Sequence, residues 1–189
     1  MNENTTFQVT YDGSSLQNHE MDVRDLAPAL LAISDVLDEA NKITYGDKTK
    51  VQVKVKGTFK SGSFGFDLSV IQAGINGLTS LFSSNEVDAA VNLLTILGFV
   101  LPNGGNQGLL GLLWWLKNRK IKKIAEEGET KTVIQVEDGD RYETSPQVIA
   151  LFSNVRIRTS IQKVVTDPLS KDGIDSFSVK NGDEEIVIK

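Results

Sequence analysis

Between residues 68 and 116 the sequence contains only two charged side chains, Glu86 and Asp88. Residues 89–116 carry no charge at all, and Pro102-Asn103-Gly104-Gly105-Asn106 divides them into two parts. Apolar runs of this length around a proline and glycine turn predict two short helices. A chain has three ways to shield such a pair from water: its own core, a second copy of the chain, or a membrane.

The composition is that of an ordinary folded domain. The 189 residues are 40% hydrophobic and 24% charged, with a formal net charge of -5, and this length favours one domain with its own core. The negative charge argues against a nucleic-acid partner. The polar first six residues lack a secretory signal, and neither apolar run reaches the roughly 20 residues of a spanning helix. We therefore expect a cytoplasmic protein that becomes membrane-associated only after activation, if at all.

Strand and helix patterns alternate in the first half of the chain. Residues 7–11 alternate between apolar and polar side chains, which predicts a strand. Asp22 precedes a helical stripe of apolar residues that ends near Gly46, so we expect a capped helix there. Residues 51–70 form two alternating runs around Lys60-Ser61-Gly62-Ser63. They predict a hairpin with one apolar face, which the helix covers.

The second half contains the same kinds of element without a repeat in sequence. Residues 133–144 predict a hairpin around Asp138-Gly139. Ser145-Pro146 then begins a second helix that runs to Asp167-Pro168, although its apolar pattern blurs in the middle. Asn181-Gly182 predicts a final hairpin with a type I′ turn.

The predicted fold class is α+β. Antiparallel hairpins pack with one long helix in each half of a single domain that spans residues 1–189. A central apolar helical hairpin interrupts this domain, within a charge-poor helical insertion at residues 68–125.

The sequence offers almost no support for catalysis. The absence of cysteine and the single histidine, His19, exclude a thiolate nucleophile and the usual zinc ligand set. Asp138, Asp140 and Glu143 fit a hairpin turn better than a metal-binding loop. The sequence contains neither a phosphate-loop motif nor a Gly-x-Ser-x-Gly elbow. We expect a non-enzymatic protein with no cofactor, metal or small-molecule substrate.

Two sets of residues are candidates for a functional role. The first combines apolar side chains, the tryptophans and cations around the predicted turn, and we expect it to contact a membrane or another subunit: Leu93, Leu97, Phe99, Leu109, Leu112, Trp114, Trp115, Lys117, Arg119 and Lys120. The second is a line of small residues at helical spacing, which lets another helix approach closely: Ala73, Gly77, Ser80 and Ser84.

The five cations in residues 117–123 have two interpretations. In the first they form a solvated helix C-terminus, where they suit the helix dipole and Lys122 and Lys123 pair with Glu126 and Glu127. In the second they anchor the chain at an anionic membrane surface together with the indole rings. The two tryptophans equally fit a role as core aromatics.

Three stretches of the sequence together resemble a group of uncharacterised bacterial and prophage-encoded proteins. They are Val23-Arg24-Asp25-Leu26-Ala27-Pro28-Ala29-Leu30-Leu31, Gly62-Ser63-Phe64 and Trp115-Leu116-Lys117-Asn118-Arg119-Lys120. In its plan the chain also resembles single-gene phage-defence proteins that shelter an apolar segment, assemble in response to a phage component and permeabilise the inner membrane. The resemblance implies self-assembly and membrane activity, and it assigns no catalytic residue.

These observations lead to two functional hypotheses. In the first, the protein self-assembles and conditionally inserts into or permeabilises the membrane, as a phage-defence or toxin-like effector. In the second, it is a soluble oligomeric protein-binding module, for example a phage-encoded inhibitor of a host factor, with the apolar hairpin as the subunit interface. Both predict a homo-oligomer with a phage or host protein as a possible partner, and the first adds the inner membrane surface.

Overall fold

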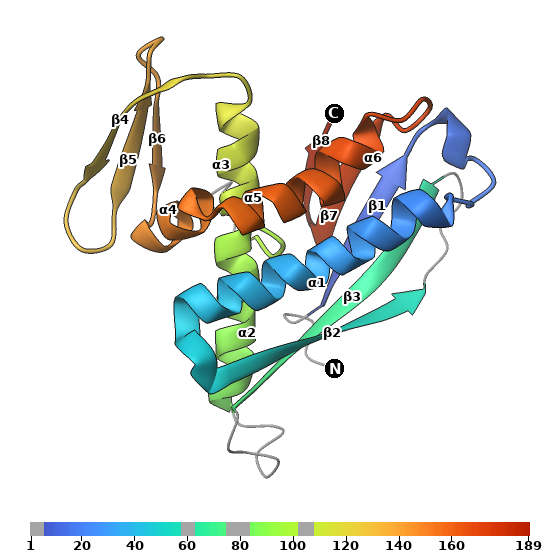
Figure 1. The fold of residues 1–189 in the computed structure, drawn as a ribbon, viewed down its shortest axis with the longest axis horizontal. Coiled ribbons are helices and arrows are strands. Elements are labelled where there is room, and N and C mark those ends of the chain that lie inside the picture. Colours follow the sequence, from blue (N-terminus) through green and yellow to red (C-terminus); the bar gives the residue numbers. More distant parts are fainter. Residues whose placement is uncertain (1–5, 58–62, 75–83, 102–107) are drawn as a thin grey trace.

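The computed structural model describes residues 6–57, 63–74, 84–101 and 108–189. These residues form a five-stranded sheet, a three-stranded sheet and helices that pack against both (Figure 1). The elements in chain order are β1 (Thr6–Asp12), a 3₁₀ turn (Ser14–Leu16), α1 (Val23–Tyr45), a 3₁₀ turn (Gly46–Lys48), β2 (Thr49–Gly57), β3 (Ser63–Gly74), α2 (Ser84–Leu97), α3 (Leu109–Leu116), β4 (Ile121–Glu126), β5 (Thr132–Val136), β6 (Arg141–Thr144), α4 (Pro146–Ser153), α5 (Val155–Ile161), a π-helical turn (Gln162–Thr166), α6 (Asp167–Leu169), β7 (Ser176–Asn181) and β8 (Glu184–Ile188). The predicted α+β class is confirmed.

The larger sheet has the strand order β2-β3-β1-β7-β8, and all its neighbours are antiparallel. With α1 between β1 and β2 and with α4 and α5 before β7, this is a split β-α-β arrangement in which the residues from α2 to β6 are inserted. Helices α1 and α5 lie side by side over one face of the sheet (Figure 1). The side chains of Phe7, Val9 and Tyr11 are buried beneath them.

Helix α1 forms where capping and periodicity predict it. The Asp22 side chain accepts a hydrogen bond from the backbone N–H of Arg24 at 2.8 Å, and Gly46 ends the helix with a φ of 70°. Its buried stripe includes Ile33 and Leu37 and faces the sheet. The prediction that this helix covers the β2–β3 hairpin is therefore confirmed.

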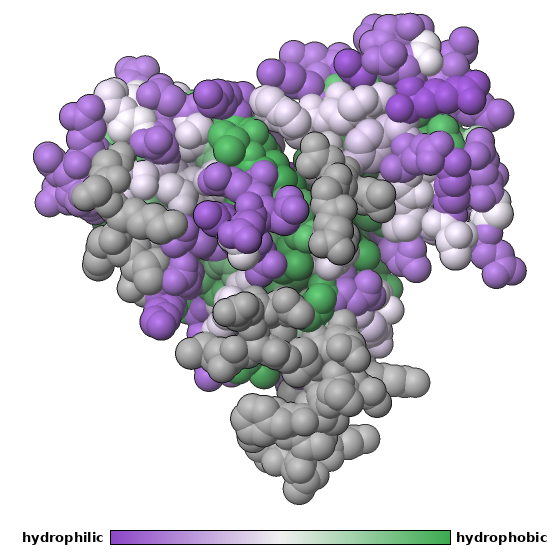
Figure 2. All heavy atoms as spheres, turned by 180° about the vertical axis from the view of Figure 1, so that it is seen from behind, coloured by the Kyte–Doolittle hydropathy of each residue, from purple (hydrophilic) through white to green (hydrophobic). Residues whose placement is uncertain are grey.

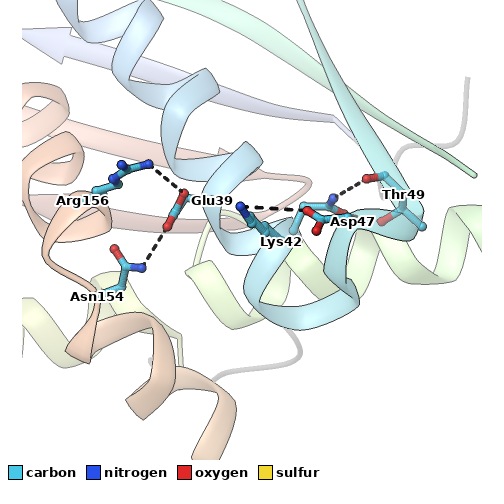
Figure 3. Close-up of polar contacts among 7 residues, drawn as sticks. Glu39, Lys42, Asp47, Thr49, Asn154 and Arg156 are labelled. Atoms are coloured by element: carbon cyan, nitrogen blue, oxygen red, sulfur yellow. Dashed lines mark hydrogen bonds and ion pairs between the residues drawn. The ribbon is translucent and has the colours of Figure 1, made fainter. Parts of the chain in front are cut away.

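A polar contact fixes α5 against α1, as Figure 3 shows. Asn154 accepts a hydrogen bond from the backbone N–H of Ile157 at 3.1 Å and so caps α5. Its amide also donates to the Glu39 carboxylate on α1 at 3.0 Å, and Arg156 lies 3.9 Å from the other carboxylate oxygen. Asn154 therefore lies at the junction of α4 and α5, caps α5 and connects this junction to α1.

The apolar segment forms the two predicted short helices, α2 and α3. Gly98 ends the region of α2 with a φ of 84°, and a Cβ on Gly108 would lie 2.4 Å from the Cα of Gly98. The two backbones thus meet where only glycine fits. Phe99 stacks on Phe7 of the sheet with 4.8 Å between ring centroids, which joins the helical hairpin to the main core.

The helical insertion is shorter at both ends than the predicted range of residues 68–125. Strand β3 extends to Gly74, and Ala73 pairs with Lys50 of β2, so the line of small residues was wrong to include Ala73 in a helix. Ser84 is the first residue of α2, whereas Gly77 and Ser80 lie outside the described residues. At the other end, the first of the two interpretations of the cations, a solvated helix C-terminus, was wrong, because α3 ends at Leu116 and Ile121–Glu126 is the edge strand β4.

The turn of the final hairpin also differs from the prediction. Asn181 pairs with Glu184, so the two loop residues are Gly182 and Asp183 rather than Asn181 and Gly182. Among them only Gly182 has a positive φ, 58°. A type I′ turn needs positive φ at both central residues, and the loop therefore has another geometry.

Candidate binding groove beside Trp114

The five aliphatic and phenyl side chains of the first candidate set lie in the core of a single chain. Each is at most 1% exposed: Leu93, Leu97, Phe99, Leu109 and Leu112. They belong to the same hydrophobic cluster as the core of the larger sheet. A partner or a membrane can therefore reach them only if this core opens.

Trp115 faces the small sheet β4-β5-β6. Its ring lies 5.1 Å from that of Tyr142 on β6, and the Arg119 guanidinium lies over it at 5.0 Å. Arg119 also contacts Asp140 at 3.0 Å and Asp138 at 3.7 Å in the β5–β6 turn. Burial raises the pKa of Tyr142 to about 12. This cluster fastens the small sheet to the end of α3.

The remaining cations of residues 117–123 do not form the predicted pairs. Lys120, Lys122 and Lys123 are exposed, and none of them takes part in an ion pair among the described residues. Glu127 instead pairs with Lys131, which also contacts Glu143. Exposed lysines on an edge strand such as β4 discourage pairing with other chains.

Trp114 faces the opposite side, into a groove between α3 and the C-terminal helices. The groove has a volume of about 590 Å³, which lies within the usual range for ligand sites. Its apolar floor comes from α3, from the segment of α5 to α6, and from the end of β8: Leu110, Leu113, Trp114, Ile161, Val165, Leu169 and Ile188. Lys117 lies 4.5 Å from the centre of a Trp114 ring at one edge.

A π-helical turn shapes the wall opposite Trp114. The buried hydroxyl of Tyr11, on β1, donates a hydrogen bond to the backbone carbonyl of Val164 at 2.6 Å. Burial also raises the pKa of Tyr11 well above its usual range. The wide turn places Ile161 and Val165 toward the groove. Such turns within helices are rare and are frequent at functional sites.

The rim of the groove is cationic. Lys117, Arg158 and Lys189 line it, and none of the described lining residues is acidic. Arg158 is held in place, because its guanidinium donates to the carbonyl of Phe152 and lies 5.6 Å from that ring. Cations around an apolar floor suit a ligand that is apolar and carries negative charge.

The groove unites Trp114 and Lys117 from the candidate set with residues that the sequence did not single out. Arg158 and Ile161 belong to the second predicted helix. The prediction of one long helix there was wrong, because Asn154 has an extended backbone and divides it into α4 and α5, and the blurred apolar pattern marks this break. The two other side chains considered for chemistry serve local structure. A ring nitrogen of His19 lies 3.0 Å from the carbonyl of Ser63, and Asp138 accepts from the backbone N–H of Asp140 in its turn.

Comparison with known proteins adds no further constraint. No protein-family model, curated protein or solved structure matches the chain. Within the part of the chain that the structure describes, no helix combines the length and the apolar character needed to cross a membrane.

Proposed function

We propose that the protein is a non-enzymatic binding module whose groove holds an apolar segment of a partner protein, flanked by acidic side chains. The observation that carries this proposal is an apolar floor bordered by three cations and by no acid among the described residues. In a chain with a net charge of -5, this rim gives an acidic partner a local attraction that the net charge of the chain does not provide.

The size of the groove suits a short segment. Leu110 to Lys117 covers about two turns of α3, or roughly 10 Å at 1.5 Å per residue, which matches two turns of a partner helix. Trp114 is partly buried and packs on the core, so it keeps a fixed position at the surface. Partly buried tryptophan and arginine side chains are the residues that most often dominate protein–protein binding.

The hypothesis of conditional membrane insertion stays a prediction and demands a far larger change. Insertion of the helical hairpin would expose or transfer five core side chains, each of which stabilises the fold by about 1.5–3 kcal/mol through burial. The total of about 10 kcal/mol is comparable to the whole stability of a domain. Binding in the groove needs no such opening, and this difference favours a partner-binding role over a membrane effector.

The test uses Trp114 as its own reporter. The chain has two tryptophans, so Trp115→Phe leaves Trp114 alone while keeping an aromatic ring beside Tyr142. We expect an amphipathic peptide of leucine and glutamate to change Trp114 fluorescence saturably, and a leucine and lysine peptide of the same length to bind at least about tenfold more weakly. Thermal unfolding of the variant checks that the fold is intact.

A matched pair of charge reversals provides the control. Lys117→Glu should weaken binding of the acidic peptide at least about tenfold, whereas Lys123→Glu, which makes the same charge change on β4, should leave it within about twofold. Equal losses in both variants would contradict the groove and indicate unspecific attraction. Leakage of anionic phosphatidylglycerol vesicles that depends on Trp114 would instead favour the membrane hypothesis.

A further inference from the structure

In the described parts of the chain, no helix lies on one face of the larger sheet (Figure 1). Helices α1 and α5 cover the opposite face (Figure 1). On the uncovered face, Ile71 and Val187 are exposed side chains at 36% and 45%. Seen from that side, hydrophilic areas flank a hydrophobic band through the middle of the molecule (Figure 2). A hollow of about 760 Å³ lies across β2, β3, β1 and β7.

Three lysines surround this hollow. Lys54 and Lys56 extend from β2, and Lys180 extends from β7. The strand register places Lys56 opposite Asp67, Asp67 opposite Gln8, and Gln8 opposite Lys180 in one row. The row continues on β8, where Glu185 lies opposite Lys180. Neighbouring strands lie about 4.8 Å apart, so the backbones of Lys56 and Lys180 are roughly 14 Å apart. Lysine side chains therefore extend into the hollow from both ends of the row.

Among the described residues, the three lysines have no ion-pair or hydrogen-bond partner. The ion pairs among the described residues use other cations, and none of these three lysines makes a hydrogen bond there. The one carboxylate among the described residues that line the hollow, Asp67, already accepts a hydrogen bond from the Gln8 amide at 2.9 Å. The remaining lining side chains on this face, including Ser69, are neutral. Among the described residues, the three lysines therefore outnumber the two carboxylates on this surface, Asp67 in the hollow and Glu185 beside Lys180.

We infer that this hollow is a second site, separate from the groove, which binds a small molecule with two or more phosphate groups. Ammonium groups are donors without acceptor capacity and act as point charges for phosphate oxygens. Their separation at the two ends of the row requires several anionic groups in the ligand rather than one.

A small phosphate ligand fits better than a nucleic-acid strand. Proteins that hold single strands stack the bases on aromatic side chains. The only aromatic residue among the described residues lining the hollow is Phe7, and its ring is buried against Phe99 in the core. The volume also lies within the range of small-molecule sites.

The experiment is a calorimetric titration of the full chain at low salt with inorganic tripolyphosphate and with ATP. We expect both to bind the unaltered protein at one site. Lys56→Gln combined with Lys180→Gln should weaken binding at least about tenfold. A matched control combines Lys120→Gln with Lys123→Gln, which removes the same charge from exposed positions near and on β4, and should change the affinity by less than about twofold.

The Asp67→Asn variant distinguishes two roles for the lysines: binding of a phosphate ligand, or neutralisation of the Asp67 charge within the sheet. If the lysines recruit phosphate, this variant should bind several-fold more tightly, because a repelling charge is lost. If they serve only to balance Asp67, its affinity will not change. Absence of binding of both probes to the unaltered protein, or equal losses in the two double variants, would overturn the inference. Binding of a 12-nucleotide oligothymidylate with the same lysine dependence, without binding of ATP, would replace the small ligand with a nucleic acid.

Discussion

The adjacent residues Trp114 and Trp115 lie on two sides of α3 that differ in their contacts with the rest of the chain. On one side, Trp115 contacts Tyr142 and Arg119, and Arg119 contacts Asp138 and Asp140, so the aromatic and charged groups engage one another. On the other side, Trp114 has Lys117 at one edge and a groove in front of it. One side is closed by the chain itself, and the other is left open.

This difference separates structural from functional roles within one short helix. Adjacent tryptophans with trailing cations resemble a membrane anchor when they are read as a unit. In the folded chain they do not act as a unit, because residues one apart on a helix point in different directions. Trp115 and Arg119 are engaged in contacts with the small sheet, whereas Trp114 and Lys117 border the groove, where a partner can reach them.

The largest expected effect compares a core leucine with its neighbour on the open side. Leu112→Ala should lower the free energy of unfolding by about 3 kcal/mol, because Leu112 is fully buried and its truncation leaves a cavity. Leu113→Ala should cost less than about 1.5 kcal/mol, since Leu113 is only partly buried at the groove. Urea unfolding of both variants measures the difference. Equal losses of free energy would show that Leu113, at the groove, is packed as fully as Leu112 in the core.

The two tryptophans give the next comparison. Trp115→Ala should lower the free energy of unfolding by about 2 kcal/mol, because it removes the ring that contacts Tyr142 and Arg119. Trp114→Ala should cost about half as much and should abolish binding of the acidic peptide. Denaturant unfolding and calorimetric titration of the two variants check these outcomes. A destabilised Trp114 variant that still binds the peptide would reverse the assignment of the two sides.

Most of the fold could be predicted from the sequence because local signals agree with burial. The Asp22 cap, the stripe around Ile33 and the alternation in β2 and β3 each describe one element and one face. Strand β4 was missed because Lys122 and Lys123 make it look like a solvated helix end, and a bulge interrupts its pairing there. The end of β3 was missed because Ala73 and Gly74 are small and suit either element.

The groove could be predicted only in part. Trp114 and Lys117 stood out through composition, whereas Arg158 and Ile161 come from another helix some 45 residues further along the chain. Their meeting depends on tertiary packing between elements distant in the chain, which no local pattern encodes. The lysines of the sheet hollow likewise come together only through strand register.

Unfolding at alkaline pH tests how well Tyr142, on the Trp115 side of α3, is shielded from water. The unfolded chain ionises tyrosine near pH 10, whereas burial raises the pKa of Tyr142 to about 12 in the folded state. This group therefore contributes its full stability below pH 10, and the contribution falls as the pH rises toward 12. Unfolding of Tyr142→Phe between pH 8 and pH 12 should show a shallower loss than the unaltered protein. Parallel curves would mean that water reaches this side freely.

The smallest expected effect concerns the two cations at the end of α3. Arg119 contacts Asp138 and Asp140 through side chains that are between 37% and 63% exposed, and exposed ion pairs contribute about 0.2–1 kcal/mol each. Arg119→Gln should therefore lower the free energy of unfolding by less than about 1.5 kcal/mol, with a smaller loss at high salt. Lys117→Gln should leave the free energy of unfolding unchanged within about 0.5 kcal/mol. The same variant should bind the acidic peptide more weakly. Chemical denaturation at two salt concentrations measures both, and a Lys117 variant that loses stability as Arg119→Gln does would mean that Lys117 also serves the fold rather than a partner.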